Sequence, residues 1–177
     1  MRIEGGAFEV DEPEWLAMGP IGPPGRRVFF VQVESAGERL SILLEKEQVR
    51  TLASEVLGLL ERIAVEWPEG TFEPSVGVRP PIVGEPAEPL FRVATIGLGF
   101  EPERGRVLLE LHERIPAGLG DDEVLDPEGR VVRVYASRAM VRAMAEAALA
   151  SVDQGRATCP LCEFPMDPDG HACPRWN

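Results

Sequence analysis

The sequence predicts an α+β fold in which two strand–strand–strand–helix units form a mostly antiparallel sheet with two helices on one face. Two observations predict this class. In each half of the 177-residue chain, short segments with apolar residues at alternate positions precede a longer segment with apolar residues at helical spacing. The two halves also align with each other without a gap over the last strand and the helix. A short cysteine-rich tail follows the second unit.

The first half predicts a hairpin and then a helix. Residues 26–35 alternate as a strand, with Phe29, Val31 and Val33 on one face, and residues 37–45 predict a second strand after a glycine turn. The spacing becomes helical from residue 46 to residue 67. The expected apolar stripe of this helix consists of Val49, Leu52, Ala53, Val56, Leu60, Ile63, Ala64 and Trp67.

The second half repeats the pattern. Residues 90–100 and 106–115 predict two strands joined by a turn, and residues 130–136 predict a third. Ser137 is positioned to cap a helix over residues 138–152. The expected apolar stripe of this helix consists of Val141, Met144, Ala145, Ala148, Leu149 and Val152.

An internal duplication explains the repeated pattern. Residues 37–57 align with residues 129–149 without a gap. The identical pairs are Gly37/Gly129, Val49/Val141, Arg50/Arg142, Ala53/Ala145 and Leu57/Leu149. Any two units of this kind share an apolar pattern, but an ungapped match across both a strand and a helix favours duplication.

These segments predict four parts of the chain: a first α+β repeat over residues 1–66, a linker or loop over 67–89, a second repeat over 90–153 and a zinc knuckle over 154–177. The linker contains six prolines, which exclude a helix or a central strand there.

The charge and hydropathy of the chain exclude some classes of function. The formal net charge of −12 repels phosphate backbones, so nucleic acid is a disfavoured partner. The N-terminal residues have no apolar signal-peptide region, and no segment reaches the roughly 18 uninterrupted apolar residues of a membrane helix. We therefore expect no membrane association and a cytoplasmic location, where cysteines stay reduced and can bind metal.

The tail contains all three cysteines of the chain and one of its two histidines, at the spacing Cys159-x2-Cys162-x8-His171-x-Cys173. Three sulfurs and one imidazole fill a tetrahedral shell, which suits zinc better than a metal-free cysteine cluster does. A catalytic zinc usually keeps one position open for water, so the zinc is expected to be structural. We expect it to order the tail and to dock the tail on the domain. The first two cysteines also match a dithiol redox motif, but the nearby prolines and third cysteine fit that motif poorly.

Other motifs carry weaker signals. His112 is the only other histidine. Its position in a predicted strand is typical of a half-buried polar residue rather than of a catalyst. The glycine-rich residues 19–25 match no phosphate-binding loop and predict a rigid turn. The acidic residues 120–129 lack the full pattern of a calcium-binding loop and predict a solvated loop. No catalytic residue and no binding site for an organic cofactor can be identified.

Four segments resemble an uncharacterised family of bacterial proteins, found mainly in actinobacteria: GRRVFFVQVES, LEKEQVRTLAS, FRVATIGLGF and the tail CPLC…DPDGHACPRWN. The resemblance covers nearly the whole chain and implies no activity, because the family is known only as a domain of unknown function. It implies the ligand set Cys159, Cys162, His171 and Cys173. Pro174, Arg175 and Asn177 also match the family tail, whereas Trp176 occupies a variable position.

Three hypotheses about function remain open at this point. The first is a non-enzymatic binding or adaptor protein with a structural zinc and a protein partner. The second is an enzyme or small-molecule binder that uses the groove between the two repeats. The third, nucleic-acid binding by the knuckle with Arg156 and Arg175, is the weakest because the chain is acidic. The sequence decides neither the oligomeric state nor whether the protein is an enzyme.

Overall fold

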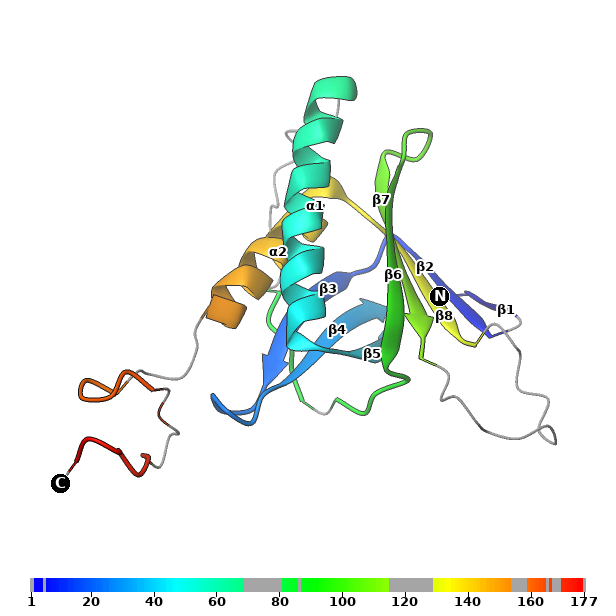
Figure 1. Ribbon diagram of the computed structural model, residues 1–177. Helices are drawn as coiled ribbons and strands as arrows, with labels where there is room; N and C mark the ends of the chain where they lie inside the picture. Colours follow the sequence, from blue (N-terminus) through cyan, green and yellow to red (C-terminus); the bar gives the residue numbers. More distant parts are fainter. Residues whose placement is uncertain are drawn as a thin grey trace.

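The computed structural model of the chain describes residues 2–4, 6–68, 81–85, 87–114, 129–153, 159–164, 166 and 170–176. These residues form an α+β fold with mostly antiparallel strand pairing, which confirms the predicted class (Figure 1). The strands are β1 (Arg2–Glu4), β2 (Ala7–Asp11), β3 (Trp15–Ile21), β4 (Val28–Ser35), β5 (Glu38–Leu44), β6 (Val93–Glu101), β7 (Arg106–Glu113) and β8 (Val131–Ala136). The helices are α1 (Lys46–Glu66) and α2 (Arg138–Asp153).

The strands belong to two sheets, where the sequence predicted one. A five-stranded sheet has the order β1-β2-β8-β7-β6, and a three-stranded sheet has the order β3-β4-β5. All pairs are antiparallel except β2 and β8, which run parallel. The sequence also placed no strand before residue 26, whereas β1, β2 and β3 all lie there.

The described chain contains the strand–strand–strand–helix order twice. β3, β4 and β5 form an antiparallel meander that leads into α1, and β6, β7 and β8 form another that leads into α2. The register matches as well, because the central row of each meander joins apolar residues at corresponding positions. These rows are Met18, Val31 and Ile42 in the first unit, and Leu98, Leu109 and Val134 in the second.

The two units interlock through the segments that precede their first strands. β2, which leads into β3 of the first unit, pairs with β8 of the second unit. The residues that lead into β6 pair in parallel with β5, through a bridge between Leu43 and Arg92. Leu43 donates its N–H to the Phe91 oxygen at 2.9 Å, and Leu90 donates its N–H to the Ser41 oxygen at 2.8 Å. Each meander therefore extends at its last strand with backbone from the other unit.

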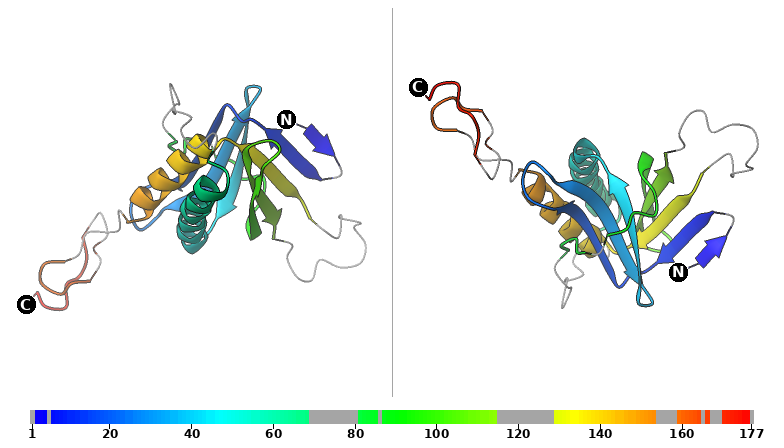
Figure 2. Two further views of the ribbon diagram at one scale, coloured as in Figure 1. Left: turned by 90° about the horizontal axis from the view of Figure 1, so that it is seen from above. Right: turned by 90° about the horizontal axis from the view of Figure 1, so that it is seen from below.

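Both helices pack against each other and against the inner faces of the sheets (Figure 2). One continuous apolar core joins the helices to residues of both meanders. Six of the eight residues predicted for the stripe of α1 are buried, from Val49 to Ile63. Ala64 is half-buried, and Trp67 follows the last helical residue, so its ring leaves the stripe and lies against Phe100 with the ring centroids 5.3 Å apart.

The two helices begin at corresponding positions. In α1, Gln48 Oε1 accepts the N–H of Glu45 at 2.8 Å, which satisfies a donor at the helix start. In α2, Ser137 Oγ accepts the N–H of Met140 at 3.2 Å, which confirms the predicted N-cap. Each helix therefore starts directly after the last strand of its meander.

The outer face of the three-stranded sheet is covered by the chain that follows α1. Within residues 81–90, Val83 packs in a small apolar cluster with Trp15, Ala17 and Phe30. The fully buried Gln32 fixes this segment, because its carboxamide donates to the Gly84 oxygen at 2.9 Å and accepts the Gly84 N–H at 2.9 Å. The described part of the proline-rich segment thus packs on the domain, whereas residues 69–80 and 86 lie outside the described residues.

Neither helix in the described part of the chain combines the length and the apolar character needed to cross a membrane.

Candidate metal centre

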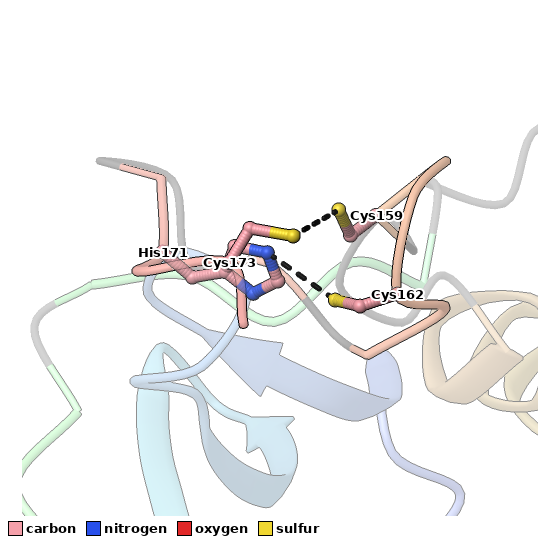
Figure 3. A group of neighbouring side chains, drawn as sticks. All are labelled: Cys159, Cys162, His171 and Cys173. Carbon is pink, nitrogen blue, oxygen red and sulfur yellow. Dashed lines mark hydrogen bonds between the residues drawn. The ribbon is translucent and has the colours of Figure 1, made fainter. Parts of the chain in front are cut away.

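The four candidate ligands lie together in the described part of the tail. Their ligand atoms, the Sγ atoms of Cys159, Cys162 and Cys173 and a ring nitrogen of His171, all lie within 4.8 Å of one another. Figure 3 shows the two cysteines of the first segment facing His171 and Cys173 of the second. Cys159 is buried and the other three are half-buried. This Cys3His cluster has a donor set that can hold a metal ion.

The first two cysteines are placed by a tight turn. The N–H of Cys159 donates to the Phe164 oxygen at 2.9 Å, and the N–H of Glu163 donates to the Cys159 oxygen at 2.8 Å. Glu163 adopts a positive φ of 62°, which reverses the chain directly after Cys162. The turn is therefore closed at both ends, and both sulfurs lie on the same side of it.

The second segment brings the other two ligands back to this turn. Gly170 has a φ of 90°, a conformation that a side chain would strain, directly before His171. The N–H of Trp176 donates to the Cys173 oxygen at 3.1 Å. Arg175 Nη1 donates to the Leu161 oxygen at 3.0 Å and so connects the two ligand-bearing segments. Sequence analysis named Arg175 as a matching tail residue and as a candidate contact to nucleic acid, but it did not predict this structural contact, which spans fourteen residues of chain.

The separations within the cluster can be compared with a tetrahedral zinc site. Zn–S bonds of about 2.3 Å and Zn–N bonds of about 2.05 Å give S···S edges of about 3.8 Å and S···N edges of about 3.6 Å. The Sγ atoms of Cys159 and Cys173 lie 3.8 Å apart. Cys162 Sγ lies 3.6 Å from His171 Nε2, and dashed lines mark both contacts in Figure 3. These two edges of the cluster have the lengths of a zinc shell.

The thiols of the cluster differ in acidity. Backbone N–H groups of Cys162 and Leu161 stabilise the thiolate of Cys159 and lower its pKa to about 6, although burial opposes this effect. Burial raises the pKa of Cys173, and the nearby sulfurs raise it further. Cys159 is thus a more acidic thiol than Cys173, and thiolates are the form in which cysteines bind metal.

The described residues of the other sequence motifs do not belong to this cluster. His112 lies in β7, half-buried, with Thr95 and Val131 opposite it. Of the glycine-rich residues 19–25, Gly19, Pro20 and Ile21 belong to β3, so the expected turn is shorter than predicted. The acidic loop lies outside the described residues apart from Gly129, which has a positive φ of 69°.

The tail lies beyond the end of α2 and apart from both sheets in all three views (Figures 1 and 2). The hydrogen bonds described above connect the tail to itself. The expectation that the tail docks on the core of the same chain is therefore not met in this arrangement.

Comparisons with known proteins place the chain in a family. Neither a curated protein nor a solved structure matches the sequence. A family model described as a protein of unknown function, DUF3090, matches residues 8–173, a span that includes both strand–strand–strand–helix units and all four candidate ligands. The chain belongs to the DUF3090 family of proteins of unknown function.

Proposed function

We propose that this protein is a non-enzymatic binding or adaptor protein whose tail is shaped by one structural zinc ion, held by Cys159, Cys162, His171 and Cys173. The observation that carries this proposal is the match between two edges of the cluster, 3.8 Å and 3.6 Å, and the edges of a tetrahedral zinc shell. The soft donor set also favours zinc over calcium or magnesium, which prefer oxygen ligands.

A structural role follows from the way the shell is filled. All four donors come from the fifteen residues between Cys159 and Cys173, and they leave no position for water or substrate. Arg175 adds a connection between the two segments that does not involve the ion. The metal would therefore supply the free energy that orders a segment too short to fold by apolar burial alone.

The proposal includes a cytoplasmic location and a protein partner. Three thiolates can hold zinc only where they stay reduced, which the cytoplasm provides. The net charge of −12 favours a partner with basic groups and disfavours nucleic acid. The alternative of an enzyme or ligand binder between the two units has less support, because the core that joins the units is buried and apolar.

We also propose that the two units arose by internal duplication. The equal strand order, the corresponding register of the two central rows and the equal helix starts support this proposal. A test is to align relatives of the chain half against half. Residues 15–66 and 93–153 should match each other in the average of many relatives, and a match no better than that between unrelated units would contradict the duplication.

The metal can be tested by elemental analysis of protein purified without added metal, with about one zinc per chain as the expected result. The chain provides a matched pair of variants. His171→Asn should lose the zinc, whereas His112→Asn, which changes the other histidine in the same way, should keep it. Iron in place of zinc, or full zinc content in His171→Asn, would contradict the proposed ligand set.

A further inference from the structure

The outer faces of the two meanders correspond position by position. In the first unit, Phe30 on β4 lies opposite Gly19 on β3 and Leu43 on β5. In the second unit, Leu108 on β7 lies opposite Gly99 on β6 and Tyr135 on β8. Each outer face thus has a large apolar side chain on its middle strand with a glycine beside it. We call these the first outer face (Trp15, Ala17, Gly19, Phe30, Gln32 and Leu43) and the second outer face (Gly97, Gly99, Leu108, Glu110, Arg133 and Tyr135).

The first outer face is covered by a segment of the same chain. A Cβ atom added at Gly19 would lie 3.7 Å from Cγ2 of Val83, which comes from the segment after α1. Phe30 is only 5% exposed beneath this segment. The carboxamide of Gln32 binds both backbone polar groups of Gly84, so the cover is held by hydrogen bonds as well as by apolar contact.

The second outer face has no such cover among the described residues. A Cβ atom added at Gly99 would meet no described atom within 4 Å. Leu108 and Glu110 are half-buried, although their counterparts Phe30 and Gln32 are buried. Glu110, the counterpart of Gln32, instead accepts a hydrogen bond from Arg133 Nε at 2.7 Å on the same face. The second face therefore has a half-buried Leu108 beside the open glycine Gly99, without a covering segment. The Tyr135 end of the row is already covered, because Arg104 lies over the ring with its Cζ 4.6 Å from the centroid and Tyr135 is only 8% exposed.

The tail has the properties expected of a segment that covers the second outer face. The tail comes after α2 in the chain, and the segment that covers the first outer face likewise comes after α1. Its large apolar side chains are exposed, with Leu161 at 49%, Phe164 at 60% and Trp176 at 78%. Their backbones are hydrogen-bonded to the ligand-bearing segments, since Phe164 contacts Cys159, Trp176 contacts Cys173 and Leu161 contacts Arg175. An ordered cluster thus presents three apolar side chains, and Gly99 on the second face leaves room for an aromatic ring, whereas the space over Gly97 is taken by Glu110.

We propose that the second outer face binds the tail of a second copy of this chain. Figures 1 and 2 show the tail beyond the end of α2, on the other side of the molecule from β6, β7 and β8 of its own chain, so the tail of a second copy is the better candidate to cover the second face. Each copy has one tail and one open face, so two copies can exchange tails reciprocally, and we include this closed two-fold arrangement in the proposal. The inference depends on the metal-ordered tail of the proposed function, since the metal fixes the positions of the three apolar side chains.

The test uses three full-length proteins and measures molar mass by sedimentation equilibrium across the micromolar range. The wild-type chain should form a dimer. A tail variant, Phe164→Ala with Trp176→Ala, should be a monomer because it loses the inserted rings. A face variant, Gly99→Arg, should also be a monomer because a long charged side chain would occupy the open floor. The space around Gly99 makes this change compatible with the fold, and Leu108→Arg provides a second face variant.

Mixing the two defective chains gives the sharpest result. The tail variant keeps an intact face and the face variant keeps an intact tail, so the mixture should contain heterodimers with one tail–face contact. A contact between two tails or between two faces would not be restored in this way. Val65→Arg, at a side chain that is 82% exposed on α1, serves as a control that should stay dimeric.

Three outcomes would overturn the proposal: a wild-type monomer across the range, variants that stay dimeric, or no heterodimer in the mixture. Circular dichroism of each variant confirms that the mass change does not come from unfolding. Zinc content is measured on the same fractions, which separates the two proposals. A chain without zinc would contradict the proposed metal site, whereas a zinc-loaded monomer would contradict only the tail exchange.

Discussion

Cys162 is the residue whose replacement best separates the order of the tail from the stability of the core. Cys162→Ser removes one of four ligands, so we expect the zinc to be released and the tail to lose its order. The meanders and helices should stay folded, because no described tail residue belongs to their apolar core. Hydrogen exchange measures the result as faster exchange confined to residues after α2.

The same experiment has two contrary outcomes. Loss of protection throughout the sheets would mean that the metal organises the whole domain. Unchanged protection of the tail in the metal-free variant would mean that the metal has no structural role. The exchange must be compared with that of the wild-type chain at the same pH, because amide exchange itself depends on pH.

The candidate site shows what sequence can and cannot predict for single residues. The Cys3His cluster could be predicted because its spacing within fifteen residues is local and the donor types are specific. The role of Arg175 could not be predicted, because any of several carbonyl groups can accept from a tail arginine and only the folded turn brings the Leu161 oxygen to it. The same holds for Gln32, whose partner Gly84 lies 52 positions away.

At the scale of elements, Ser137 sets the start of α2. Its Oγ accepts the N–H of Met140, a donor that has no partner within the helix. We expect Ser137→Ala to lower the free energy of unfolding by about 1 kcal/mol. Ser54→Ala, at an exposed position inside α1, is the matched control and should be neutral or slightly stabilising. Equal effects of the two changes in urea denaturation would show that the cap is not important.

A second element-scale contact connects β7 to the start of β8. Arg130 donates to both carboxylate oxygens of Glu113, with Nε at 2.8 Å from Oε2. This hydrogen bonding to Arg130 lowers the pKa of Glu113 below its ordinary value of 4.5, although burial opposes the shift. A carboxylate whose pKa is lower in the folded state stabilises that state above its ordinary pKa, and this stability is lost as the pH falls through the lowered pKa.

We therefore expect Glu113→Gln to destabilise the protein at neutral pH and to have less effect in acid. The difference in unfolding free energy between wild type and variant should be constant above pH 4.5 and should shrink progressively below it. Urea denaturation at a series of pH values measures this difference. A difference that is independent of pH would mean that the ion pair with Arg130 contributes nothing to the acid sensitivity of the fold.

The success of sequence analysis also differed between elements. Both helices were predicted within about two residues, because a long stripe at helical spacing is a strong local signal. β3 was missed because Trp15, Leu16, Ala17 and Met18 are all buried, so the strand shows no alternation. β1 and β2 contain only three and five residues, too few to establish a period. The division into two sheets depends on long-range pairing, such as that of β2 with β8, which no local pattern specifies.

At the scale of the whole molecule, the two units form one structure because their helices share a single core. α1 and α2 pack against each other, and Arg138 Nη1 at the start of α2 donates to the Trp67 oxygen at the end of α1 at 2.7 Å. Ala53 and Ala145 occupy corresponding positions in the two helices, and both are fully buried. Both alanines belong to the apolar core that the two helices share.

This correspondence predicts matched effects of the same substitution in the two units. Ala145→Leu and Ala53→Leu each add three carbon atoms to a filled core, and each should lower the free energy of unfolding by roughly 1–3 kcal/mol. Ala150→Leu adds the same atoms at an exposed position of α2 and should change stability by less than about 0.5 kcal/mol. Urea denaturation of the three variants measures these effects. A large cost at Ala145 with none at Ala53 would mean that the two helices contribute unequally to the shared core, and it would weaken the argument from structure for an internal duplication.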